Sequence, residues 1–251
     1  MDLNLKGKVA VITGAGGGAM GTGVCLDLGR EGSCVVANDI DPTRADEVAK
    51  QAIELGAKAV PTYADVTKLD DCQQMAETAL AAFGRIDILV TIPAYPVLGL
   101  FVETPEEEWH KIVDVTLWGV VNSVRAVLDP MIEQKSGSIV CLGSESGKVA
   151  PEREVIYGVA KAGVMHFAKG LCTEVGPHGI RINVVNAAVT KVPQMVESGW
   201  MTPEKESRMA KLYPLRRIGR PQDLVDAILF LSSDRASFIT GQTFSVSGGA
   251  V

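Results

Sequence analysis

The feature that most constrains the fold is an alternation, along almost the whole chain, of short apolar runs with longer segments of helical period. The apolar runs are nearly continuous rather than alternating, which is typical of strands buried on both faces of a parallel sheet. They lie at 8–13, 33–39, 58–65, 86–91, 137–144, 180–186 and 242–248, and the helical segments at 21–31, 43–55, 69–83, 105–133, 156–175 and 221–232. Such repetition predicts βαβ units. We therefore expect an α/β fold, in which residues 1–251 form a single domain around a doubly wound parallel sheet of about seven strands, with helices on both faces.

Composition excludes several classes of function. The formal net charge is −6 without a basic cluster, so we expect no nucleic acid among the partners. The five cysteines and three histidines are scattered without ligand-like spacing, so we expect reduced thiols and no metal site. No apolar stretch approaches the ~20 residues of a membrane span, and the first residues do not resemble a signal peptide. The sequence predicts a soluble, cytoplasmic protein that does not bind membranes.

Residues 13–23, "TGAGGGAMGTG", form a glycine-rich turn directly after the apolar run "KVAVI". A turn of this kind between a first strand and a first helix presents backbone N–H groups at the helix N-terminus, where a pyrophosphate binds. Glycine is needed there because a Cβ atom would block close approach or an unusual backbone angle. Many tight strand–helix turns also use glycine, so the turn alone is weak support for a nucleotide site.

Asp39 strengthens that support, because it ends the second predicted strand, where a carboxylate accepts hydrogen bonds from both ribose hydroxyls of an adenosine. No Lys or Arg occurs from position 9 to 29. A 2′-phosphate needs such a cation and would be repelled by Asp39. If a dinucleotide binds, we expect NAD(H) rather than NADP(H). The alternative is that Asp39 is a solvated loop carboxylate beside Asp41.

The segment "YGVAK" places Tyr157 and Lys161 one helical turn apart on the same face. A nearby ammonium stabilises a phenolate and lowers the pKa of a tyrosine from ~10 toward neutrality, which suits a general acid/base. Such pairs are commonplace on helix surfaces. Ser144 favours the catalytic interpretation, because it ends the fifth predicted strand, and ligands of open α/β sheets bind outside those strand ends.

Taken in their order along the chain, the motifs resemble those of the short-chain dehydrogenase/reductase family, and the resemblance covers essentially the full chain. The matching features are the glycine turn, Asp39, "AD" at 64–65, "DILV" at 87–90, Ser144, "YGVAK", "RIN" at 181–183 and the tail that begins "PLRRIGRPQDL". The separation of thirteen residues between Ser144 and Tyr157 is also the family's usual one. The resemblance implies a Rossmann-like sheet and hydride transfer between NAD(P)(H) and an alcohol or ketone.

The resemblance also implies residue roles. Tyr157 would be the general acid/base, Lys161 would hold the ribose and lower the pKa of Tyr157, and Ser144 would orient the substrate oxygen. Asp65 would contact the adenine edge. The implied catalytic residues are Ser144, Tyr157, Lys161 and Thr116, and the implied cofactor residues are Gly14, Gly18, Met20, Gly21, Asp39, Asp65, Val66, Ala94, Tyr157 and Lys161. Family members commonly form homotetramers through the helices expected at 105–133 and 156–175 and through the C-terminal elements, so we expect a homo- or hetero-tetramer.

Four motifs depart from the family pattern, and all lie near the expected cofactor. The glycine turn has one extra residue near Ala19, so that its third glycine is Gly21. "TIPA" at 91–94 replaces NNAG, Thr116 replaces an asparagine, and "AA" at 187–188 replaces PG. Two hypotheses remain. The chain is an active NAD-dependent dehydrogenase with remodelled loops, or it is a cofactor-impaired, non-catalytic subunit that supports a paralogous partner. The intact Ser144, Tyr157 and Lys161 favour activity.

Segment 189–213 contains prolines, Trp200 and three methionines, and it lacks strand character. It is either a lid-like insertion over the site or an ordinary surface excursion. Together with "PVLGLF" at 96–101, Met195, Trp200 and Met201 suggest an apolar pocket wall for a bulky apolar, aromatic or acyl-type substrate. The alternative is that these side chains only form the core of the insertion.

Overall fold

The computed structural model describes residues 2–250, and Met1 and Val251, the two ends of the predicted domain, lie outside this range. Over the described residues the chain forms one parallel seven-stranded sheet with strand order β3-β2-β1-β4-β5-β6-β7. The predicted fold, a single doubly wound α/β domain, is therefore confirmed.

The strands and helices lie close to their predicted positions. The strands are β1 (Val9–Thr13), β2 (Cys34–Asn38), β3 (Ala59–Thr62), β4 (Ile88–Thr91), β5 (Gly137–Ser144), β6 (Ile180–Ala187) and β7 (Thr243–Val246). The helices are α1 (Ala19–Arg30), α2 (Pro42–Glu54), α3 (Leu69–Phe83), α4 (Glu106–Val113), α5 (Gly119–Gln134), α6 (Ser146–Val149), α7 (Val155–Val175), α8 (Pro193–Glu197), α9 (Pro203–Ala210) and α10 (Pro221–Ser232).

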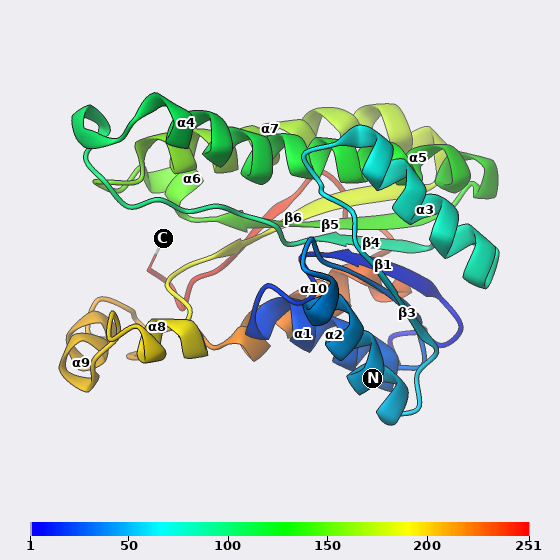
Figure 1. The fold of residues 1–251 in the computed structure, drawn as a ribbon, viewed down its shortest axis with the longest axis horizontal. Coiled ribbons are helices and arrows are strands. Elements are labelled where there is room, and N and C mark those ends of the chain that lie inside the picture. The colour runs from blue at the N-terminus through cyan, green and yellow to red at the C-terminus, as the bar shows by residue number, and fades with distance from the viewer. Residues whose placement is uncertain (1, 251) are drawn as a thin grey trace.

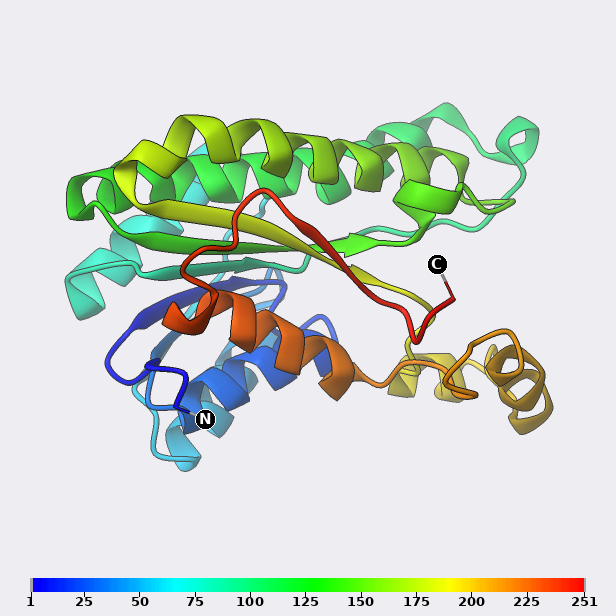
Figure 2. The same ribbon diagram turned by 180° about the vertical axis from the view of Figure 1, so that it is seen from behind.

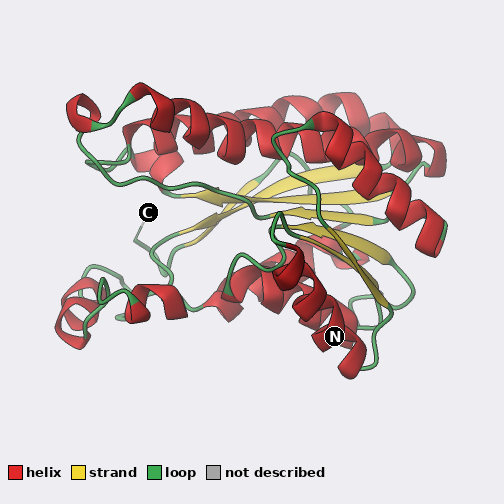
Figure 3. Ribbon diagram, viewed as in Figure 1, coloured by secondary structure: helices red, strands yellow, loops and turns green. Residues whose placement is uncertain are grey.

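Helices cover both faces of the sheet, which explains why the strands are apolar throughout. Helices α3, α4, α5 and α7 lie over one face, and α1, α2 and α10 lie over the other (Figures 1, 2 and 3). Along β1, Val9 and Val11 point into the core on the α5 and α7 side, whereas Ala10 and Ile12 point into the core on the α1 and α10 side. Both sets of side chains are therefore buried.

The helix expected over 105–133 is not continuous. A π-helical turn over Asp114–Trp118 separates α4 from α5. Gly119 approaches the α3 side so closely that a Cβ atom there would lie 2.7 Å from Val66 Cγ2. The hydroxyl of buried Thr116 accepts a hydrogen bond from the Tyr95 N–H at 3.1 Å. These contacts come from distant parts of the chain, so helical periodicity does not reveal the interruption.

The order of the strands determines where a ligand can bind. β1 pairs with β2 on one side and with β4 on the other. Successive strands are therefore added in opposite directions from the point between β1 and β4. In open α/β sheets the ligand crevice lies outside the carboxyl ends of the strands at this switch point. The glycine turn follows β1 there, and "TIPA" follows β4. Among residues 2–250, no helix is long and apolar enough to cross a membrane.

Candidate active site

The glycine turn connects β1 to α1 by a backbone path that only glycine adopts easily. Gly14 and Gly18 have φ angles of 72° and 129°, in the region that disfavours residues with a Cβ atom. Helix α1 begins at Ala19, two residues before the predicted start, so the extra residue of the turn is part of the first helical turn. At Gly21 a Cβ atom would lie 2.2 Å from the Gly14 carbonyl oxygen. Gly21 thus allows α1 to pack directly on the strand end.

This helix N-terminus has the features of an anion site. The N–H groups of Ala19, Met20 and Gly21 donate no hydrogen bond to any other described residue, as expected for the first turn of a helix. Gly18 precedes them and carries no side chain to cover them. Helix α1 is 12 residues long, so its dipole adds to the attraction for negative charge.

Asp39 lies directly behind the glycine turn and is only 4% exposed. Its Oδ2 accepts a hydrogen bond from the Gly16 N–H at 3.0 Å, and its Oδ1 accepts one from the Asp41 N–H at 3.1 Å. It is therefore not a solvated loop carboxylate. Each carboxylate oxygen can accept a second hydrogen bond, so the side chain retains the capacity to accept hydrogen bonds from two hydroxyl groups.

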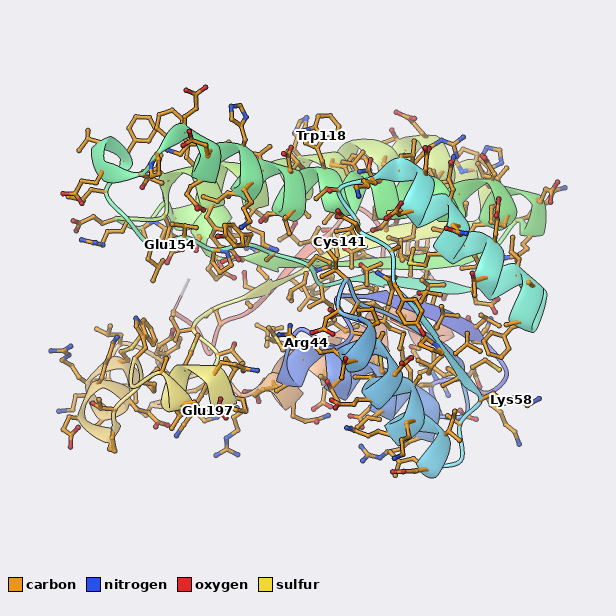
Figure 4. The ribbon with its side chains drawn as sticks, viewed as in Figure 1. Arg44, Lys58, Trp118, Cys141, Glu154 and Glu197 are labelled. Atoms are coloured by element: carbon orange, nitrogen blue, oxygen red, sulfur yellow. The ribbon has the colours of Figure 1, made fainter. Side chains whose placement is uncertain are left out.

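Arg44 is a cation near the turn that the sequence analysis missed, because it lies on α2 rather than between positions 9 and 29 (Figure 4). A Cβ atom on Gly16 would lie 2.3 Å from the Arg44 Cβ atom. Nε of Arg44 is 3.3 Å from Asp41 Oδ2, and both side chains are about half exposed. The guanidinium is therefore already paired with a carboxylate.

The residues that follow β3 form a polar turn. Asp65 Oδ1 accepts hydrogen bonds from the backbone N–H and the hydroxyl of Thr67, at 3.0 and 2.8 Å. The Val66 carbonyl accepts a hydrogen bond from the Asn122 side chain on α5 at 3.0 Å. Asp65 and Val66 are thus held at the carboxyl edge of the sheet, beside the end of β2.

After β4, Pro93 lies against the glycine turn. A Cβ atom on Gly14 would be 3.2 Å from the Pro93 nitrogen and 3.3 Å from its ring carbons. Ala94 follows and is partly buried. The backbone N–H of the next residue, Tyr95, donates a hydrogen bond to the Thr116 hydroxyl. Thr116 is therefore bonded to the residue directly after the substituted motif at 91–94.

Ser144, Tyr157 and Lys161 lie together at the end of β5 and the start of α7. Lys161 is 1% exposed, and its Nζ donates a hydrogen bond to the Leu142 carbonyl at 2.5 Å. The same Nζ atom is 5.8 Å from the centre of the Tyr157 ring. Ser144 lies within hydrogen-bonding reach of the Tyr157 phenol. The three predicted side chains are thus neighbours.

The pKa of Tyr157 differs from the sequence-based expectation. Burial and the negative charge of Glu154 outweigh the opposing effect of the nearby Ser144 hydroxyl and raise this pKa to about 12, rather than lowering it toward neutrality. Burial also lowers the pKa of Lys161 to about 8, because the charged form loses solvation. The expectation that Lys161 dominates the ionisation of Tyr157 is wrong for this structure. Desolvation and Glu154, neither visible in the "YGVAK" spacing, have larger effects.

The segment at 189–213 consists of α8, α9 and their connections, and it extends beyond the carboxyl edge of the sheet (Figure 1). Gln194 of α8 lies over the glycine turn, since a Cβ atom on Gly18 would be 3.4 Å from its Nε2. Met201 is buried in a small core with Tyr213 and Ile218 rather than in a pocket wall. Trp200 is 37% exposed, and Lys205 Nζ lies 3.3 Å from the centre of its ring.

Comparisons with known proteins agree with this arrangement. A family model described as enoyl-(acyl carrier protein) reductase matches residues 14–251. The 3-oxoacyl-(acyl-carrier-protein) reductase of Thermotoga maritima is 36% identical, over 99% of this chain and 100% of the relative. Cyclohexanol dehydrogenase of an Acinetobacter species is 32% identical, over 99% and 96%. The structure of 7α-hydroxysteroid dehydrogenase complexed with NADH and 7-oxo glycochenodeoxycholic acid superimposes with a TM-score of 0.93 at 29% identity, over 100% of this chain and 96% of that one.

The family match covers nearly the whole chain, and the relatives align from end to end. The chain belongs to the short-chain dehydrogenase/reductase family of oxidoreductases.

Proposed function

We propose that this oxidoreductase interconverts a secondary alcohol and a ketone, with NAD(H) as the cofactor and Tyr157 as the general acid/base. The observation that carries the proposal is the convergence of Ser144, Tyr157 and Lys161 at the sheet edge where the glycine turn exposes its N–H groups. Hydride transfer from a nicotinamide cofactor to a carbonyl needs hydroxyl groups beside the carbonyl oxygen and an anion site for the cofactor. The oxygen needs a proton donor, and the cofactor needs a phosphate anchor.

The residues at this edge fit a dinucleotide. The N–H groups of Ala19 to Gly21 would bind the pyrophosphate, Asp39 the adenosine ribose, and Lys161 the ribose next to the nicotinamide. Asp65, Val66 and Ala94 would border the rest of the cofactor. When bound, the nicotinamide supplies or accepts the hydride. Gly16 donates a hydrogen bond to Asp39, so we infer that the glycine turn shifts when the ribose binds to this carboxylate. We also infer that Gln194 of α8 then covers the pyrophosphate as part of a lid.

The proton chemistry follows from the two pKa values. A phenol with a pKa near 12 keeps its proton at neutral pH, so Tyr157 is poised to donate it to a carbonyl oxygen. Lys161, with a pKa near 8, is mostly charged at neutral pH. Its charge stabilises the phenolate that forms when the proton leaves. Ser144 would hold the substrate oxygen beside the phenol.

For the substrate we propose a bulky apolar ketone, either alicyclic or acyl. The named relatives act on 3-oxoacyl groups and cyclohexanol, and a 7-oxo steroid occupies the structural neighbour. In this chain the segment after β4 offers Leu98 and Phe101, which are 51% and 46% exposed, and Phe101 stacks on Trp109. We place this segment at the mouth of the site, where its apolar surface would favour apolar groups.

The test is transfer of deuterium from NADH labelled at nicotinamide C4 to cyclohexanone, an acetoacetyl thioester and a 7-oxo steroid, followed by mass spectrometry of the alcohols. We expect label in at least one product. Absence of label from all three, together with no binding of NADH, would instead support the non-catalytic subunit.

The coenzyme preference provides a second prediction. We expect wild type to bind NADH at least roughly tenfold more tightly than NADPH, because Asp39 repels a 2′-phosphate, and Asp39→Asn to remove most of that difference. Calorimetric titration with both coenzymes measures it. The matched control is Asp46→Asn, which neutralises an exposed carboxylate farther along α2. A wild type that prefers NADPH would show that Arg44, and not Asp39, determines the choice.

We also propose that subunits assemble through the α5 and α7 face. Trp118, Val155 and Val159 are 51%, 50% and 60% exposed there, and apolar side chains gathered on helices mark a contact surface. A second copy or a paralogous chain would bury them, giving a homo- or hetero-tetramer.

A further inference from the structure

The hydroxyl of Ser144 belongs to a chain of three side chains that ends at Glu154, a residue that the family motifs do not include. Ser144 Oγ accepts a hydrogen bond from the Ser146 N–H at 3.1 Å and donates one to Ser146 Oγ at 3.0 Å. Ser146 Oγ in turn donates to Glu154 Oε2. Glu154 lies in the loop just before α7 (Figure 4). Its negative charge is close enough to Tyr157 to raise the pKa of the phenol.

The direction of each hydrogen bond in this chain is fixed by chemistry. An ionised carboxylate accepts hydrogen bonds and has none to donate. Ser146 must therefore give its single hydroxyl proton to Glu154, and it then receives the proton of Ser144. The Ser144 oxygen also accepts from the Ser146 backbone, so it is left with one lone pair and no free proton. In this state Ser144 faces the site only as an acceptor.

The proposed reaction requires the opposite. The substrate oxygen gains negative charge in the transition state, whether the hydride arrives or leaves, and only donors stabilise that charge. An acceptor beside it is repulsive. Ser144 must therefore release Ser146 and turn its proton toward the substrate before it assists the reaction.

We propose that Glu154 is a positioning residue that, through Ser146, holds the Ser144 proton away from the substrate oxygen until a bound substrate breaks the Ser144–Ser146 hydrogen bond. The inference rests on the proposed function, because Ser144 has a substrate oxygen to face only if the chain is a dehydrogenase. Of the other charges nearby, Lys161 is bonded to the Leu142 carbonyl. The buried Glu145 has its nearest cation, Lys148 Nζ, at 4.0 Å. Neither joins the chain from Ser144 to Glu154.

Ser146→Ala is the sharpest test, because it removes the hydroxyl and keeps the backbone N–H that places Ser144. We expect kcat/KM to rise roughly threefold to tenfold, the size of one hydrogen bond. With saturating coenzyme and unchanged affinities for NAD and NADH, the factor must be equal for ketone reduction and alcohol oxidation, since the equilibrium between reactants is unchanged. The matched control is Thr173→Ala, which removes an exposed hydroxyl near the other end of α7. A kcat/KM that stays constant or falls in Ser146→Ala overturns the proposal.

A second readout does not need turnover. Tyrosinate absorbance is measured during a pH titration, and the same titration of a Tyr157→Phe blank is subtracted. The difference reports the pKa of Tyr157 over the pH range in which circular dichroism shows a folded chain. We expect this pKa to fall in Ser146→Ala, since the released Ser144 donates to the phenolate. It should fall further in Glu154→Gln, which also removes the charge that raises it. Thr173→Ala should not change it.

The two readouts separate this inference from the proposed function. An unchanged Tyr157 pKa in Ser146→Ala overturns the positioning role even if every ketone is reduced. If wild type reduces no ketone and the pKa still falls, the hydrogen-bond chain acts as described and the proposed function is the part that fails.

Discussion

Tyr157→Phe is expected to lower kcat by about 10²- to 10⁴-fold, the contribution typical of a general acid/base, without loss of folding or NADH binding. The Tyr157 phenol is the group for which we propose proton transfer to the substrate oxygen. Phenylalanine removes this hydroxyl and keeps the aromatic ring in the same packing. The measurement is steady-state reduction of the ketone with the highest turnover, together with circular dichroism and a calorimetric NADH titration.

Tyr63→Phe is the matched control, because it removes the same hydroxyl from a half-exposed tyrosine. Within residues 2–250 that hydroxyl bonds only to Asp46. It should leave kcat unchanged. A Tyr157→Phe protein that turns over at the wild-type rate would reject the role assigned to the phenol. A protein that loses NADH binding as well would show that Tyr157 holds the cofactor rather than the proton.

Gly21→Ala should lower the free energy of unfolding by about 1–3 kcal/mol, the cost of overpacking a tight contact, and weaken NADH binding. The new Cβ atom would lie 2.2 Å from the Gly14 carbonyl oxygen and 2.6 Å from that of Ala15. Ala15 is fully buried, and its N–H is bonded to the Asn38 carbonyl at 2.9 Å, so it has little freedom to move. Urea unfolding followed by circular dichroism measures the change.

Gly170→Ala is the control for this substitution. Gly170 lies within α7, and among residues 2–250 no atom outside its own stretch of helix lies within 4 Å of its added Cβ atom. There alanine should stabilise the chain by about 0.5–1 kcal/mol, because glycine is the weaker helix former. If both variants unfold at the same urea concentration, α1 does not pack on the strand end as closely as the structure indicates.

The sequence predicts the fold well because the information is local. A strand such as β1 is apolar at every position, since alternate side chains enter two different cores. Helix α7 and strand β5 begin or end within one residue of their predicted limits. The proximity of Ser144, Tyr157 and Lys161 is also predictable from the sequence, because parallel strands and the helices after them meet at one edge of the sheet.

What the sequence does not reveal depends on contacts between distant segments. Arg44 reaches the glycine turn because α2 packs beside it, and position 44 carries no local sign of this. The π-helical turn around Thr116 forms where Gly119 meets Val66 and where the Thr116 hydroxyl binds Tyr95. The pKa of Tyr157 depends on its burial and on Glu154, and helical spacing encodes neither.

The extra residue of the glycine turn and the substituted motifs at 91–94 and at Thr116 raise the question of whether the chain still binds its cofactor. Wild-type unfolding in urea, with and without NADH, answers it most directly. With NADH at about a hundred times its Kd, a site of the proposed kind raises the free energy of unfolding by about 2.7 kcal/mol. An unfolding curve that does not change at millimolar NADH, for a chain that is folded at the outset, would contradict the account.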